Sequence, residues 1–180
     1  MDIERRIRRL EDRAEIRNLH ARYANAVDDR DLAVIGDCFC EDGVFGRWGT
    51  DDRAEGREAV VQFYRDRLGG TGPSFHYPHA AEIVFDDDDN AHGTLTAHAE
   101  MGVGGRLLIA GLRYMDRYRR DPDGRWRFAE RYSRFYYFMP HDELDANYEA
   151  TDRITWPAPA RPADLPDGLD TWKAFIEGDA

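Results

Sequence analysis

Lysine is almost missing from this chain of 180 residues: Lys173 is the only one, and arginine supplies the rest of the basic charge. Acidic residues outnumber basic residues by 36 to 25, which gives a formal net charge of −11. A charge of this sign repels polyanions, so we expect neither nucleic acid nor an anionic membrane as a partner. We attribute the arginine bias to a GC-rich genome and not to an arginine-based binding site.

Cysteine is scarce as well. Cys38 and Cys40 are the only two, and they lie two positions apart. One such pair gives no disulfide framework and is weak evidence for a metal. We expect one of them to be buried and the other partly exposed.

Long apolar segments are also lacking. No apolar run reaches the ~20 residues of a membrane span, and residues 1–6 are charged, without the apolar region of a signal peptide. We therefore expect a cytoplasmic protein. No G-x-G-x-x-G sequence follows a strand, and the histidines lack convincing ligand spacing, so we expect neither a cofactor nor a metal. The acidic run at 86–89 is interpreted as a solvated hairpin tip.

The first 70 residues have mainly helical patterns. Apolar residues at three-to-four spacing predict a long amphipathic helix over 3–29. Asp31 can cap a second, short helix that runs through Phe39. Residues 41–43 read as a turn, 44–48 as a short strand, and 56–68 as a third helix that ends at two glycines.

Four strand-like segments follow, over about 75–86, 91–101, 106–120 and 125–138, separated by turn residues. This order predicts an α+β fold in which a curved, mostly antiparallel sheet wraps the long first helix as a half-open cone. We expect residues 1–140 to form this domain. Residues 141–180, interrupted by prolines, are expected to form an extension that packs on the domain or on a neighbouring subunit, with a final short helix over 169–176.

One carboxylate and one imidazole stand out within this architecture. Asp28 lies near the end of the first helix, where the helix dipole disfavours an acidic residue, and His76 lies where the sheet region begins. The cone would bring the two side chains together. A carboxylate that holds an imidazole in one tautomer makes it a general base.

Five segments together resemble the SnoaL-like group of the nuclear-transport-factor-2-like superfamily. They are residues 23–32, 39–43, 56–60, 75–77 and 123–131. The resemblance implies the cone-shaped fold and a cavity. In detail, the chain is similar to family members that dehydrate scytalone or bile acids or that remove hydrogen chloride from hexachlorocyclohexane. In those enzymes an Asp–His dyad corresponds to Asp28 and His76, and the enzymes with this dyad are trimers.

The resemblance also implies further site residues. Tyr23 matches a tyrosine five residues before the dyad aspartate of the bile acid enzyme, and Arg131 matches an arginine that assists the dehydrochlorinase dyad. His79 matches a second histidine of the bile acid enzyme. The dehydrochlorinase lysine falls at Tyr23, which favours dehydration over dechlorination, and Ala99 falls near a strand aspartate that is not reproduced.

Several assignments stay open at the level of sequence. His98 is interpreted as a polar wall of the substrate pocket and His79 as a second substrate contact, and a metal at His76 and His79 would need a loop at Pro78. Arg134 competes with Arg131, because the two have opposite strand parity.

The preferred function is a cofactor-free lyase that eliminates water from a cyclic or polycyclic small molecule. Its catalytic residues are His76, Asp28, Tyr23 and Arg131. An isomerase or polyketide cyclase would begin with the same deprotonation. A non-catalytic small-molecule-binding protein and an accessory subunit of a ring-hydroxylating dioxygenase are the other classes. We expect a homo-oligomer, a trimer in preference to a dimer.

Overall fold

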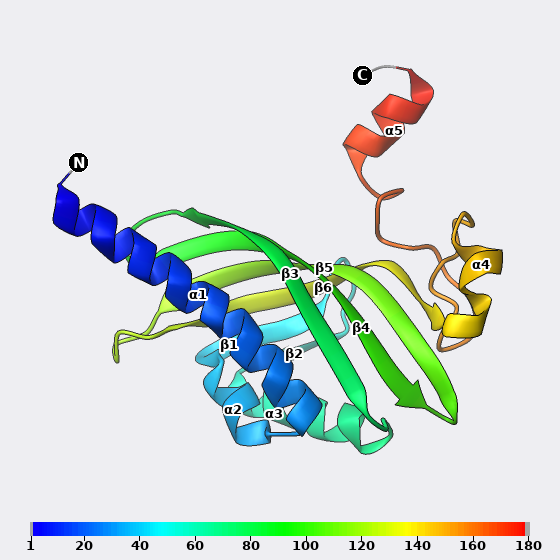
Figure 1. Ribbon diagram of the computed structural model, residues 1–180, viewed down its shortest axis with the longest axis horizontal. Helices are drawn as coiled ribbons and strands as arrows, with labels where there is room; N and C mark the ends of the chain where they lie inside the picture. The colour runs from blue at the N-terminus through cyan, green and yellow to red at the C-terminus, as the bar shows by residue number, and fades with distance from the viewer. Residues whose placement is uncertain (1, 179–180) are drawn as a thin grey trace.

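A six-stranded curved sheet with the strand order β2-β1-β6-β5-β4-β3 forms the body of the computed structural model, which describes residues 2–178 (Figure 1). Every neighbouring pair is antiparallel except β1 and β6, which are parallel. The strands are β1 (Phe39–Arg47), β2 (Arg53–Glu55), β3 (Ser74–Phe85), β4 (Asn90–Val103), β5 (Arg106–Arg120) and β6 (Trp126–Pro140). The predicted α+β class with a curved, mostly antiparallel sheet is confirmed.

The long helix α1 (Ile3–Asp29) crosses one face of this sheet (Figure 1). Its second half carries the residues buried against the sheet, among them Ile16, Leu19 and Tyr23. The apolar residues of its first turns, such as Ile7 and Leu10, are exposed, because this end of the helix projects past the sheet. The other helices are α2 (Leu32–Asp37), α3 (Arg57–Gly69), α4 (Leu144–Asn147) and α5 (Asp170–Glu177), with the 3-10 turn η1 (His141–Glu143) before α4.

The segment around residue 40 corrects the prediction from sequence. Helix α2 ends at Asp37 and β1 begins at Phe39, so Phe39 is not helical and residues 41–43 are not a turn. Phe39 is fully buried and pairs with Phe128 of β6, and the register shifts between Phe39 and Val44. A Cβ at Gly43 would lie 3.0 Å from the carbonyl oxygen of Phe128. Glycine therefore serves here for close backbone approach within a bulged strand.

Both cysteines are buried, which corrects the expectation that one would be partly exposed. Residues 38 and 40 lie at the join of α2 and β1, next to the aromatic core. Within residues 2–178, no group of three or more histidine, cysteine or acidic side chains is arranged to hold a metal ion, and no helix is long and apolar enough to cross a membrane.

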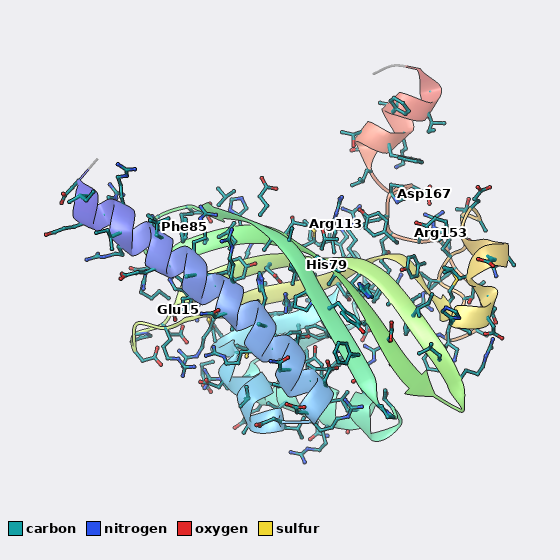
Figure 2. The ribbon with its side chains drawn as sticks, viewed as in Figure 1. Glu15, His79, Phe85, Arg113, Arg153 and Asp167 are labelled. Carbon is teal, nitrogen blue, oxygen red and sulfur yellow. The ribbon has the colours of Figure 1, made fainter. Side chains whose placement is uncertain are left out.

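The C-terminal extension packs partly on its own domain. Ile154 is fully buried and forms a bridge with Phe138 of β6, and Arg153 pairs with Asp167 at 2.5 Å (Figure 2). Helix α5 stands away from the rest of the chain (Figure 1), and Phe175 on it is 71% exposed. Residues 151–167 thus belong to the domain surface around β6, whereas the final helix has no packing partner among the described residues.

Candidate functional site

The carboxylate of Asp28 lies against the ring and backbone of His76. Asp28 Oδ1 lies 2.7 Å from His76 Nδ1, and Asp28 Oδ2 accepts a hydrogen bond of 2.8 Å from the His76 backbone N–H. Asp28 belongs to the last turn of α1 and His76 to the start of β3. The two residues that the sequence singled out, 48 positions apart, therefore form one unit.

Two further residues fix this pair. Ser74 donates its hydroxyl hydrogen to Asp28 Oδ1 at 2.9 Å, and Arg30 donates to the Ser74 oxygen at 2.8 Å. Arg30 also donates to the carbonyl of Gly72 at 2.5 Å. It ends α1 in a left-handed conformation, with φ of 63°, which costs a non-glycine residue ~1 kcal/mol or more. These hydrogen bonds hold the residue there and tie the helix end to the strand.

The hydrogen bonds decide the charge of Asp28 and the tautomer of His76. Burial by itself would raise the pKa of Asp28, but the hydrogen bonds from His76 and Ser74 outweigh it and hold that pKa below its ordinary value. Asp28 is therefore a carboxylate at neutral pH and can only accept hydrogen bonds. His76 must donate from Nδ1, which leaves Nε2 with its lone pair. Among residues 2–178, Nε2 of His76 has no hydrogen-bond partner.

His76 lines a cavity of about 290 Å³ between the helices and the curved sheet. This volume is at the lower end of the range for small-molecule sites, roughly 300–1,000 Å³. Most of the lining is apolar; Val27, Phe45, Phe63 and Leu112 are among the residues that form it. The base therefore faces a space suited to a small apolar body.

Tyr23 lines the same cavity, and its hydroxyl is hydrogen-bonded to that of Tyr64 on α3. Both side chains are buried. Burial raises the pKa of Tyr23 well above its ordinary value, and it raises the pKa of Tyr64 as well. Both phenols therefore stay protonated at neutral pH and can act as hydrogen-bond donors or acids. Tyr114, also buried, completes this polar wall.

Arg131 lies beneath this wall and does not line the cavity. It is fully buried, donates two hydrogen bonds to Asp116 at 2.9 and 3.0 Å, and its guanidinium lies 4.5 Å from the centre of the Tyr23 ring and 4.0 Å from that of Tyr114. Arg134 does not line the cavity either and lies over Trp48. Neither arginine contacts the cavity, so Arg131 can act on a ligand only through the tyrosines that cover it.

His79 and His98 also lie outside the cavity lining. His98 Nδ1 lies 2.7 Å from His79 Nε2, and the His98 ring stacks on Tyr77 with ring centres 4.2 Å apart. On β4, Ala97 and Ala99 are buried and flank His98, which places the histidine on the opposite, outer face of the sheet. His79 is on β3 (Figure 2). This placement corrects the interpretation of both histidines as residues of the pocket.

Sequence reasoning did not identify Ser74, Arg30, Tyr64 or Tyr114 as site residues. Ser74 had a usable signal, because it precedes His76 by two positions on one strand and so shares its face. Tyr64 follows the buried Val60 by four positions on α3, which gives it the same helix face. Arg30 and Tyr114 had no such local signal.

A second buried histidine makes stability depend on pH. Burial lowers the pKa of His20 to about 3, and the Arg131 charge adds to this effect. Asp116 lies 3.6 Å from His20, but it does not offset the effect because it pairs with Arg131. The unfolded chain takes up this proton near pH ~6.5, so between that pH and about 3 the unfolded state binds more protons.

As the pH is lowered through this window, we expect His20 to reduce the free energy of unfolding by ~1.4 kcal/mol per pH unit. Urea unfolding of wild type and His20→Gln at pH 7 and pH 5 tests this expectation. From pH 7 to pH 5, wild type should lose ~2 kcal/mol more of its free energy of unfolding than the variant does. His141→Gln, at an exposed position, is the matched control. An equal response of the two variants to pH would contradict the assignment.

Comparisons with known proteins agree with this fold. The family model described as a SnoaL-like domain matches residues 8–132, which include both members of the Asp28–His76 pair. Among proteins of curated function, no sequence matches the chain.

Solved structures with the same fold include three with high coverage. A hexachlorocyclohexane dehydrochlorinase, LinA type 2, is 22% identical with a TM-score of 0.69, over 74% of this chain and 91% of that chain. A candidate scytalone dehydratase from Novosphingobium aromaticivorans is 18% identical with a TM-score of 0.69, over 74% and 90%. A candidate aromatic ring hydroxylase from the same organism is 25% identical with a TM-score of 0.67, over 76% and 96%.

Proposed function

We propose that this chain, which belongs to the SnoaL-like domain family, is a lyase that eliminates water from a small cyclic molecule, with His76 as the general base. The observation that carries the proposal is the Asp28–His76 pair beside the cavity, at 2.7 Å. The names of two solved structures of the same fold, a dehydrochlorinase and a candidate scytalone dehydratase, describe elimination reactions and support the same reaction class.

The reaction would couple the removal of a proton from carbon to the loss of water from the neighbouring carbon. Nε2 of His76 removes a proton from a carbon next to a carbonyl group, and the electron pair of that C–H bond forms the new C=C bond. The C–O bond on the neighbouring carbon breaks, and the hydroxyl leaves as water with a proton from the Tyr23–Tyr64 pair. The pair regains a proton from solvent, and His76 returns its own proton to solvent. Asp28 stabilises the imidazolium in between.

The polar wall assists where negative charge develops. A phenol with a raised pKa is a fixed hydrogen-bond donor, and such donors stabilise an enolate or a departing oxygen most when they are already in place. Arg131, packed against the Tyr23 and Tyr114 rings, holds these rings and supplies positive charge beneath them. We propose it as a positioning residue.

An assay for carbon deprotonation tests the proposal before the substrate is known. The protein would be incubated in D2O with a panel of cyclic β-hydroxy ketones and esters, and 1H NMR would follow both deuterium incorporation and new vinyl protons. New vinyl protons identify a lyase, and deuterium in the remaining substrate appears as well when the deprotonated carbon takes up a deuteron before the hydroxyl leaves. Exchange without loss of water would favour an isomerase or polyketide cyclase instead. Binding of panel compounds in the cavity without exchange would favour a binding protein.

We also propose that the protein is a trimer. Phe75 is 55% exposed on β3, and with Tyr77, His79 and His98 it forms an aromatic patch on the outer face of the sheet; such patches mark interfaces. Light scattering should give a mass three times the 20.8 kDa of one chain, and Phe75→Asp should reduce that mass. A wild-type protein of 20.8 kDa at micromolar concentration would defeat this proposal.

A further inference from the structure

Three arginines line the cavity away from the dyad. Arg47 comes from the end of β1, Arg67 from α3 and Arg161 from the C-terminal extension. The overall composition gave no reason to expect an arginine site, and the chain as a whole is strongly acidic, with a net charge of −11. Cationic side chains from three separate elements nonetheless converge on one space.

Within residues 2–178, acidic side chains neutralise this group only in part. Arg47 pairs with Asp164 at 3.2 Å, and Asp164 also accepts a hydrogen bond from the backbone of Phe135. Asp52 lines the cavity as well. Counting these two carboxylates against three guanidinium groups leaves one positive charge. Among residues 2–178, neither Arg67 nor Arg161 forms an ion pair within 4.0 Å.

Two of these guanidinium groups have unused donors. The Nε atoms of Arg47 and Arg161 are buried without a hydrogen-bond partner. A buried donor without a partner costs ~1–3 kcal/mol, and more when it is charged. Burial, and then the nearby Arg47, lower the pKa of Arg161, and Asp164 and Asp52 only partly oppose them. An anion in the cavity would relieve both the repulsion and the missing hydrogen bonds.

The backbone around Arg161 shows that its position is fixed. Its N–H donates to the carbonyl of Ile154 at 2.9 Å, and its carbonyl accepts from the Ile154 N–H at 3.2 Å. Ile154 is itself buried and forms a bridge with Phe138 of β6. Trp156 and Pro157 of the same segment line the cavity. The C-terminal extension therefore contributes a preformed wall of the cavity.

Arg47 and the dyad come from strands far apart in the sheet that lines the binding space. His76 is on β3, at one edge of the sheet, and Arg47 is on β1; β4, β5 and β6 lie between them. Four strand spacings of ~4.8 Å separate the two along the curved sheet. Side chains reaching into the cavity shorten this span. A group bound at Arg47, with Arg161 near it, would be a part of the ligand other than the reacting carbon at His76.

We propose that Arg161, together with Arg47 and Arg67, binds a carboxylate at the end of the substrate opposite the carbon that His76 deprotonates. The inference rests on the proposed function, because it takes the ligand of this cavity to be the substrate. One uncompensated positive charge matches a carboxylate better than a phosphate group, which carries up to two negative charges. The planar guanidinium also matches the planar carboxylate in two-point hydrogen bonding.

A pair of probes that differ only in charge tests this assignment. 1-Naphthaleneacetate and 1-naphthaleneacetamide have the same aromatic body, and calorimetry measures their dissociation constants. We expect wild type to bind the carboxylate at least about tenfold more tightly than the amide, and Arg161→Gln and Arg67→Gln to reduce that ratio to near one without weakening the amide. Arg117→Gln, an exposed arginine on β5, makes the same charge change outside the cavity and should keep the ratio.

Three results would overturn the proposal. One is a wild-type protein that does not prefer the carboxylate, including one that binds neither probe. Another is an unchanged ratio in both Arg161→Gln and Arg67→Gln. The last is tighter binding of 1-naphthyl phosphate than of the carboxylate by tenfold or more. His76→Ala should keep the ratio, so a failure of this binding test is separate from a failure of the proposed chemistry.

Discussion

Replacing His76 with alanine should reduce turnover by ~10²- to 10⁴-fold, the usual contribution of a general base. The expected loss follows from the geometry: Nε2 is the ring nitrogen of His76 that Asp28 leaves free, and no other histidine lines the cavity among the described residues. The fold should survive, because the His76 side chain is partly exposed. Deuterium incorporation into the substrate should be lost together with the elimination of water, and far-UV circular dichroism should remain unchanged.

Asp28→Asn should produce a comparable loss. An asparagine can donate to Nδ1 and so permit the wrong tautomer, and it no longer stabilises the imidazolium. The double variant should be little worse than either single variant, because the two residues act as one unit. Asp29→Asn, one position further along α1 and exposed, is the matched control and should retain activity.

The dyad would be structural if the two losses multiplied in the double variant. The same conclusion would follow if His76→Ala chiefly lowered the melting temperature while exchange of the substrate proton continued. In either case, the binding-protein interpretation would replace the lyase.

The contact between Asp28 and His76 could be predicted because a local pattern in the sequence placed each of the two residues on its element. The 3.6-residue period placed Asp28 on the last turn of a long helix, and the alternation after residue 74 placed His76 at the start of a strand. The resemblance to the family then supplied the relation between them. The precise bounds of α1, and those of β3 to β6 to within two residues, followed from the same periods and from the turn residues between them.

The two errors have different causes: at Gly43 long-range packing overrides a local signal, whereas at His98 the prediction ran against one. Gly43 was interpreted as a turn residue, whereas it provides room for the Phe128 backbone in a bulged strand. His98 was placed in the pocket although Ala97 and Ala99 on either side are the inward residues. Here the strand period was available and would have placed the histidine on the outer face.

Other features depend on contacts that the sequence does not show. The resemblance pointed to Arg131, but only the structure shows that Tyr23 and Tyr114 cover it. Arg161 reaches the cavity because an irregular, proline-interrupted segment returns to β6, and such a path has no period to detect. Side chains brought together by covering layers or irregular segments therefore remain beyond a sequence-based prediction.

Replacing Arg131 with methionine should cost the largest amount of stability of any change considered, ~3–5 kcal/mol of the free energy of unfolding. The side chain of its partner Asp116 is fully buried, and once the guanidinium is gone it keeps, among the described residues, one hydrogen bond of 3.0 Å from Tyr118 and the neutral ring of His20 at 3.6 Å. Burial already raises the pKa of Asp116, and Arg131 is the main group that opposes this rise. The lost partner leaves a charge in the core without compensation.

The sign of the pH dependence identifies this mechanism. Without Arg131, the pKa of Asp116 in the folded state rises further, so the folded variant binds a proton that the unfolded chain binds only near pH ~4. A group with a raised folded pKa stabilises the fold at low pH. The loss in Arg131→Met relative to wild type, measured by urea unfolding, should therefore be larger at pH 8 than at pH 5.

Two further variants separate charge from packing. The double variant Asp116→Leu/Arg131→Met removes both charges and should recover most of the loss, since apolar residues of similar volume often replace a buried ion pair at little cost. Arg117→Met breaks an exposed pair with Glu130 on the same two strands, at 3.7 Å, and should change stability by less than ~0.5 kcal/mol. Additive losses in the double variant, or a loss in Arg131→Met independent of pH, would show that Arg131 stabilises the fold by its stacking on Tyr23 and Tyr114 and not by its pairing with Asp116.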